Sequence, residues 1–216
     1  LNEKYSKEEV TGYGKICVPR MINNIAENEN RNKVIIYLAK KLVESGKQVL
    51  LLSDRRNHLS YLYGKINQFT TVGYYIGGMK QKDLDKSEKA NVILGTFPMS
   101  SEGLDIPTLD SVIFATPKSS IEQSIGRITR KKHAQLPVAY DLIDNFSLFP
   151  RQYIKRERVY KRLKYDVYYG SLTVTNNQIS DSAIEYFLDT GFTKKDFSRK
   201  KKKKKQEVVE CLIDDD

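Results

Sequence analysis

The stretch Gln48-Val-Leu-Leu-Leu-Ser53 is a short apolar run, and Asp54 and then Leu59, Leu62 and Ile66 at helical spacing follow it. A continuous apolar run bounded by turn residues is typical of a strand buried on both faces of a sheet. Asp54 is expected to cap the helix that comes next. The stretch therefore predicts one strand followed by one helix.

The same alternation of strands and helices continues on both sides of this unit. Val34, Leu38 and Leu42 predict a preceding helix, which Gly46 stops. Further strands are expected at 71–76, 91–96, 111–115 and 138–143, and further helices at 81–88 and from 119 or 120 to 130. Such alternation predicts a three-layer α/β sandwich with a mostly parallel central sheet. Function is expected at the carboxyl ends of its strands.

The composition allows one packed core with appendages. The chain has 216 residues, 39% apolar and 30% charged, without an apolar run near the ~20 residues of a membrane span. The net charge is +10, but residues 194–205 hold nine basic residues against one Asp, so the rest carries only +2. The positive charge is therefore concentrated in one segment, and it does not indicate a generally basic surface that binds nucleic acid. Without a long apolar run, no membrane partner is expected.

The cysteines and the first residue give two further expectations. Cys17 and Cys211 lie near opposite ends without a CxxC or Cys/His cluster, so neither a metal site nor a disulfide framework is expected. A reducing, intracellular compartment fits this usage. Leu1 is not Met and starts no secretion signal, which predicts that the sequence begins at a domain boundary.

The segment Gln123-Ser-Ile-Gly-Arg-Ile-Thr-Arg130 carries the strongest chemical signal. On a helix Gln123, Arg127 and Arg130 share one face, and two guanidinium groups there can clamp a phosphate. Gly126 costs this helix about 1 kcal/mol relative to Ala, which suggests that something approaches its backbone. The alternative is a solvated basic face, since two lysines follow directly.

A second segment lies upstream, Asn91-Val-Ile-Leu-Gly-Thr-Phe-Pro-Met-Ser-Ser-Glu-Gly-Leu-Asp-Ile-Pro107, which predicts a strand running into a polar loop. With the strand at 109–116 between them, the two segments resemble motifs V and VI of the second RecA-like domain of superfamily 2 helicases. Leu52–His58 resembles motif IV, and Ile76–Lys80 extends the match.

Two differences from the motifs of DEAD-box proteins indicate which helicases the chain resembles most. One extra residue separates Thr96 from Gly103 compared with DEAD-box proteins, and the last motif begins with Gln123 rather than His. The chain is more similar to helicases of large nucleocytoplasmic DNA viruses, of the poxvirus transcript-release type, and to certain phage helicases. The resemblance covers about residues 30–165.

The resemblance implies an ATP site and assigns six residues to it: Glu102, Gly103, Asp105, Gln123, Arg127 and Arg130. The two arginines would stabilise charge on the γ-phosphate during transfer. The aspartate would lie near the ribose hydroxyls with the glutamate and glycine beside it, and the glutamine would couple the nucleotide to the other lobe. The alternative for the aspartate is a turn residue before Pro107.

The resemblance also implies contacts with a nucleic-acid backbone. Ser53, Arg55, Gly77, Gly78 and Thr96 would hold phosphates, which positions a strand without reading its sequence. The glycine pair is otherwise an ordinary tight turn, and the arginine one more exposed helix charge.

The chain lacks two sequence motifs that a complete ATP site requires. It has no Gly-x-x-x-x-Gly-Lys-Ser/Thr loop for phosphates and no strand-end acidic pair for magnesium. ATP and Mg²⁺ are therefore expected only in the full-length protein, with Mg²⁺ held by a missing N-terminal RecA-like lobe, and this chain alone is expected to be inactive.

Four parts are expected along the chain: a lead-in at 1–29, a RecA-like lobe at 30–146, a small basic extension at 147–191 and a lysine-rich tail at 192–216. The extension should begin with a helix to about 165, whose apolar face is Ile154, Val159 and Leu163, followed by a strand-like 167–175 and a helix at 181–189. Its basic segment 151–164 is either a nucleic-acid contact or a solvated face. The tail is a localisation signal, a nucleic-acid anchor or a passive segment.

These observations favour the C-terminal motor lobe of an ATP-dependent DNA or RNA helicase. A non-catalytic nucleic-acid-binding module on the same fold is the alternative, and a glycosyl- or nucleotidyl-transferase is a third class. The resemblance implies DNA or RNA, the missing lobe and transcription machinery as partners. It implies a location in the host cytoplasm or nucleus, or in the virion, for a viral protein.

Overall fold

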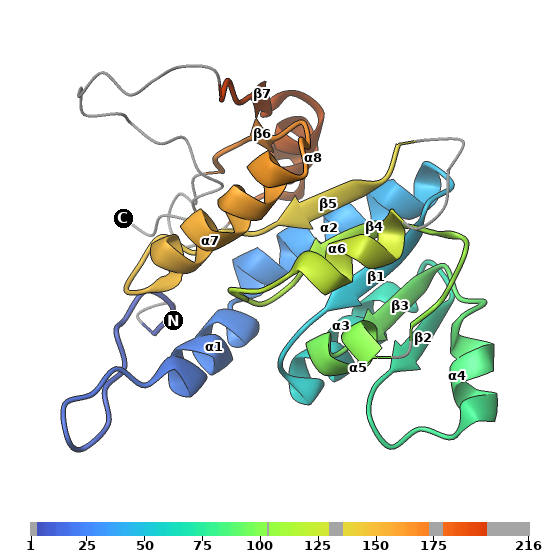
Figure 1. Ribbon diagram of the computed structural model, residues 1–216, viewed down its shortest axis with the longest axis horizontal. Coiled ribbons are helices and arrows are strands. Elements are labelled where there is room, and N and C mark those ends of the chain that lie inside the picture. Colours follow the sequence, from blue (N-terminus) through green and yellow to red (C-terminus); the bar gives the residue numbers. More distant parts are fainter. Residues whose placement is uncertain (1–3, 103, 130–135, 173–178, 198–216) are drawn as a thin grey trace.

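Five parallel strands form the central sheet of the protein (Figure 1). The structure is a computed structural model that describes residues 4–102, 104–129, 136–172 and 179–197. The strands are β1 (Gln48–Leu52), β2 (Val72–Tyr75), β3 (Val92–Gly95), β4 (Leu109–Phe114) and β5 (Val138–Asp141). They follow the order β2-β3-β1-β4-β5, and each neighbouring pair is parallel. The predicted mostly parallel sheet is confirmed.

Helices cover both faces of this sheet. Against one face pack α2 (Glu29–Glu44), α3 (Arg56–Ile66) and α8 (Asp181–Thr190). Against the other pack α4 (Gln81–Ser87), α5 (Phe97–Glu102), α6 (Glu122–Ile128) and α7 (Phe149–Arg162). Within β1, Val49 and Leu51 join the first core and Leu50 and Leu52 the second. This burial on both faces explains why the strand reads as a continuous apolar run.

The first residues of the chain pack on one end of this sandwich. Helix α1 (Val18–Glu27) buries Met21 and Ile25, which lie in a third cluster with Tyr5 and Phe149. The segment 1–29, expected as a lead-in, thus contains a helix within its described residues. The apolar residues of this segment have helical spacing, but many asparagines separate them. The sequence signal for this helix is therefore weaker than that for the strands.

The apolar face predicted for the helix after residue 147 is wrong, because helix α7 buries a different set of residues. Ile154 and Leu163 are 45% and 41% exposed. The buried face consists of Phe149, Tyr153, Arg156 and Tyr160. Large aromatic rings bury more area than aliphatic side chains. The arginine among them is paired with Asp141, so its charge does not prevent burial.

Three further local expectations are wrong. Asp54 does not cap α3, because Arg55 occupies the N-cap position without a side-chain cap bond, and the Asp54 carboxylate pairs with Lys118 at 3.0 and 3.1 Å. The polar loop expected after β3 begins with the short helix α5. Helix α6 begins only at Glu122 and ends at Ile128.

The C-terminal extension contains less strand than predicted. Of the expected strand at 167–175, the described residues form only β6 (Tyr168–Tyr169), which pairs antiparallel with β7 (Thr193–Lys194). The predicted helix at 181–189 is confirmed as α8, which Ser180 caps by accepting from the Ala183 N–H. Among the described residues, no helix combines the length and apolar character needed to cross a bilayer.

Candidate functional site

Arg127 joins the two segments singled out in the sequence. Its Nη1 donates to the carbonyl oxygen of Leu104 at 2.7 Å, and its Nη2 donates to the carbonyl oxygen of Ser101. The hydroxyls of Ser100 and Ser124 lie 3.2 Å apart and make a second link between α5 and α6. The segment after β3 is therefore fixed directly against the arginine helix.

Two further candidate nucleotide residues, Gln123 and Asp105, lie around this junction. Gln123 is exposed one turn before Arg127 on α6, and Asp105 is exposed immediately after Leu104. Burial raises the pKa of the Glu88 carboxyl, and the neighbouring Asp85 and Asp105 carboxylates raise it further. The site thus combines a partly exposed arginine with carboxylates.

Gly103 and Arg130 lie outside the described residues, and Glu102 is described only as the last residue of α5. A Cβ added to Gly126 would meet no heavy atom within 4 Å, so nothing in the described chain approaches it closely. Any close approach to this position would come from outside the described residues.

The hydroxyl of Ser53 is satisfied within the chain. The side chain is fully buried, and its Oγ lies 3.1 Å from His58 Nδ1 and accepts from the Arg55 N–H at 3.1 Å. His58 Nε2 lies 2.8 Å from Asn32 Oδ1. Burial, and next the charge of Arg31, lowers the pKa of His58 to about 3, so the ring is neutral. These contacts favour a positioning role for the serine.

Arg55 ties the carboxyl end of β1 to α1. Its guanidinium donates to the carbonyl oxygen of Pro19 at 2.9 Å, to that of Asp54 at 3.1 Å and to the side-chain oxygen of Asn23. The side chain is half-buried, so it is not an ordinary exposed helix charge.

The remaining backbone-contact candidates lie on neighbouring loops. Because β2 and β3 are adjacent and parallel, the Gly77-Gly78 turn and Thr96 meet at the same edge of the sheet. Gly78 has φ +91°, which favours glycine, and Arg56 Nη2 donates to the Gly77 carbonyl at 2.8 Å. Since β1 is the next strand, Ser53 lies at this edge too.

Two charged groups at the same edge have partners that the sequence did not indicate. Lys118, just after β4, pairs with Asp54 and lies 5.0 Å from the ring centre of Phe97. Its position just after a predicted strand could have indicated a site residue, but nothing in the sequence indicated its partners.

The other charged group is a buried ion pair. Arg31 Nε donates to Asp144 Oδ1 at 3.0 Å and its Nη2 to Oδ2 at 3.2 Å, and both side chains are 1% exposed. The Tyr5 hydroxyl donates to the same carboxylate at 2.6 Å, and Arg31 Nη1 donates to the Ala115 carbonyl. This cluster joins the N-terminal segment, α2 and the ends of β4 and β5.

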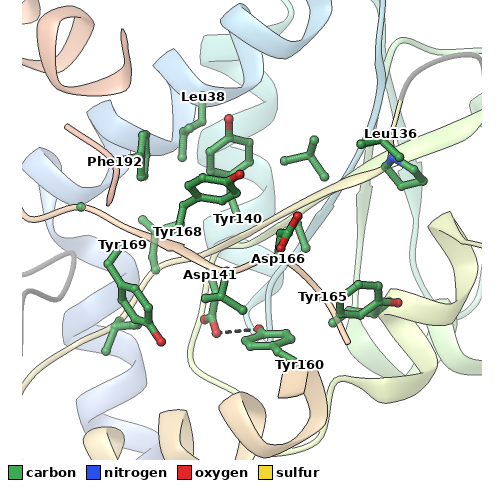
Figure 2. A pocket seen from close by; sticks show the side chains of 18 of the residues that line it. Leu38, Leu136, Tyr140, Asp141, Tyr160, Tyr165, Asp166, Tyr168, Tyr169 and Phe192 are labelled. Atoms are coloured by element: carbon green, nitrogen blue, oxygen red, sulfur yellow. Dashed lines mark hydrogen bonds between the residues drawn. The ribbon is translucent and has the colours of Figure 1, made fainter. Parts of the chain in front are cut away.

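The cavity of about 600 Å³ beside β5 is a separate feature. Figure 2 shows aromatic rings around it, among them Tyr140, Tyr165 and Tyr168. None of the candidate site residues lines it. Among the described residues no group of three or more His, Cys, Asp or Glu is placed to hold a metal ion.

Part of this chain is similar in sequence to known proteins. Residues 19–132 match the family described as helicase conserved C-terminal domain. A putative ATP-dependent RNA helicase of Acanthamoeba polyphaga mimivirus is 42% identical over 154 residues, 68% of this chain and 30% of that protein. A transcript termination protein of Myxoma virus (strain Lausanne) is 29% identical over 122 residues, 51% of this chain and 26% of that protein.

The fold is also found among solved structures. The crystal structure of T4 UvsW superposes with a TM-score of 0.60 and 21% sequence identity, over 76% of this chain and 38% of that one. At this identity the likeness shows the fold alone. The chain spans about a third or less of the length of the two viral relatives, 30% and 26%.

Proposed function

Because the chain belongs to the family of helicase conserved C-terminal domains, we propose that it is the C-terminal motor lobe of an ATP-dependent helicase or translocase acting on DNA or RNA. The observation that carries the proposal is the junction of α6 with the segment after β3. Arg127 is held there by the carbonyl oxygens of Ser101 and Leu104 while its side chain stays partly exposed.

The groups at this junction fit one half of an ATP site. Arg127 is permanently positive and suits the γ-phosphate, and the exposed Asp105 carboxylate can accept hydrogen bonds from ribose hydroxyls. Gln123, one turn before the arginine, would face the other lobe, and Arg130 would supply a second guanidinium. Bound ATP supplies the phosphoryl group that is transferred to water, and Mg²⁺ would be held by the N-terminal lobe.

The role of this lobe is electrostatic and positional. Arginine fingers stabilise the charge that develops on the transferred phosphoryl group, which contributes about 10³ to 10⁵ in kcat. Closure of two lobes on ATP and release after hydrolysis would alternate their grips on one strand. On this lobe the grip would come from the loops with Thr96, Gly77 and Gly78, together with Ser53 and Arg55 at the same edge of the sheet.

The names of the relatives suggest the wider setting. The mimivirus relative is named an RNA helicase and the Myxoma relative a transcript termination protein, which favours RNA and transcription machinery as partners. The free Cys17 thiol is compatible with a reducing, intracellular location.

The test compares ATP hydrolysis by the full-length protein and by the 216-residue chain, each with and without a single-stranded oligonucleotide. We expect stimulated turnover of about 1 s⁻¹ or faster from the full-length protein. The chain alone should not exceed the buffer blank, because its sequence lacks a phosphate loop. Hydrolysis by the chain alone would contradict the half-site. A full-length protein that binds the oligonucleotide without hydrolysing ATP would be a non-catalytic binding module.

A further inference from the structure

Helix α7 is anchored on the sheet by its buried face, through Phe149, Tyr153, Arg156 and Tyr160. Arg156 Nε donates to Asp141 Oδ2 at 2.7 Å and its Nη1 to the Lys118 carbonyl at 2.6 Å. The Tyr160 hydroxyl donates to the same carboxylate oxygen at 2.7 Å. These bonds, together with aromatic packing, hold the helix in one orientation.

The opposite face of α7 carries a basic stripe, consisting of the exposed residues Arg151, Lys155, Arg158 and Arg162. Each lies two positions after a residue of the buried face, a rotation of about 200° around the helix axis. The stripe therefore points away from the sheet. From first to last it extends ~16 Å along the helix at 1.5 Å per residue.

Most of the stripe's charge is not neutralised by the protein. Arg151, Lys155 and Arg158 make no ion pair within the part of the chain that the structure describes, and Arg162 pairs with Glu122 on α6. Glu157 is the helix's acidic residue. Although burial raises its pKa, hydrogen bonds from Lys195 and Tyr169 hold it below the ordinary value, so this carboxylate is engaged elsewhere.

The stripe lies apart from the loops proposed to grip nucleic acid. Helix α7 follows β5, which forms the edge of the sheet opposite β2, and Figure 1 shows α7 on that side. At its first turn, Phe149 packs in one cluster with Met21 and Ile25 of α1. Arg55 donates to the carbonyl of Pro19 on the same helix. The stripe thus begins near the carboxyl edge of the sheet and runs on along its outer side.

We propose that this stripe is a second contact for a nucleic-acid backbone, which extends the surface of the motor lobe past β5. The inference rests on the proposed function for the presence of a nucleic acid. Three of the four residues are arginines, whose planar guanidinium groups bind phosphates through paired hydrogen bonds. Phosphates of one strand repeat every ~3.4 Å of helix axis in duplex DNA, so the length of the stripe spans several of them. The contact is independent of base sequence.

The test uses the full-length protein with Arg151→Gln and Arg158→Gln combined. The matched control combines Lys33→Gln and Lys40→Gln, two exposed residues with the same spacing of seven on α2, which covers the opposite face of the sheet. Binding of a fluorescent single-stranded oligonucleotide is measured over a series of KCl concentrations. Circular dichroism checks that both variants remain folded.

The stripe variant is expected to bind about tenfold more weakly than the parent at ~0.15 M KCl, and the slope of log K against log[KCl] should fall by about 1.4. The control should keep the parent slope. Equal slopes in all three proteins would overturn the proposal. That result would instead favour an acidic protein as the partner that binds the stripe. ATP turnover at saturating oligonucleotide should be the same in all three proteins. If none of them hydrolysed ATP, the proposed function would be refuted, and the measured oligonucleotide affinities would still test the stripe.

Discussion

Replacing Arg127 by Ala in the full-length protein is expected to lower nucleic-acid-stimulated ATP turnover by about 10³-fold or more, as for other arginine fingers. Arg127→Lys should recover little of this loss, because an ammonium group keeps the charge but not the planar fork of donors. The measurement is kcat at saturating ATP and oligonucleotide, which removes any effect on binding of either ligand.

Arg127 also supports the backbone at Ser101 and Leu104, so its variants need a structural control. Ser124→Ala removes the other polar link between α5 and α6, a hydrogen bond worth about 1 kcal/mol, without removing a cation. It should keep turnover within a few-fold of the parent. If Ser124→Ala lost as much activity as Arg127→Ala, the packing of α5 on α6 would explain the effect, and the finger assignment would fail.

The second large effect is expected on stability. Asp144→Ala should destabilise the chain by about 3–5 kcal/mol, because Arg31 would remain buried without its partner carboxylate. Tyr5 would lose its acceptor at the same time. Urea unfolding of the 216-residue chain, followed by circular dichroism, measures this change.

The control removes an exposed carboxylate from a comparable pair. Asp189 pairs with Lys41, but their side chains are 65% and 40% exposed. Asp189→Ala should therefore change stability by no more than about 1 kcal/mol. Equal losses in the two variants would contradict the view that the buried pair fastens the N-terminal segment to the sheet.

The sheet was predictable because burial on both faces requires continuous apolar strands. Residues 48–53 and 91–96 showed this pattern clearly, and both became central strands. Helix α7 was predicted in position but not in orientation. Its anchoring face contains Arg156, and only the tertiary pairing with Asp141 shows that this residue can be buried.

The candidate site was partly predictable for a similar reason. Spacing predicted Gln123 and Arg127 on one helix, and the structure shows that the segment after β3 lies against Arg127. The contacts of Arg55 depend on α1, a helix whose packing the sequence did not indicate. Internal bonds of this kind join residues distant in the sequence, and residue spacing carries no information about them.

The proposed role of this lobe is to supply arginine fingers to an ATP site shared with another lobe. The most direct measurement is single-turnover ATP hydrolysis by the full-length Arg130→Ala protein, with ATP affinity and oligonucleotide affinity measured separately. We expect hydrolysis slower by about 10³-fold or more while fold and oligonucleotide binding stay close to those of the parent protein. Unchanged hydrolysis in a folded, oligonucleotide-bound Arg130→Ala protein would contradict the role of arginine finger.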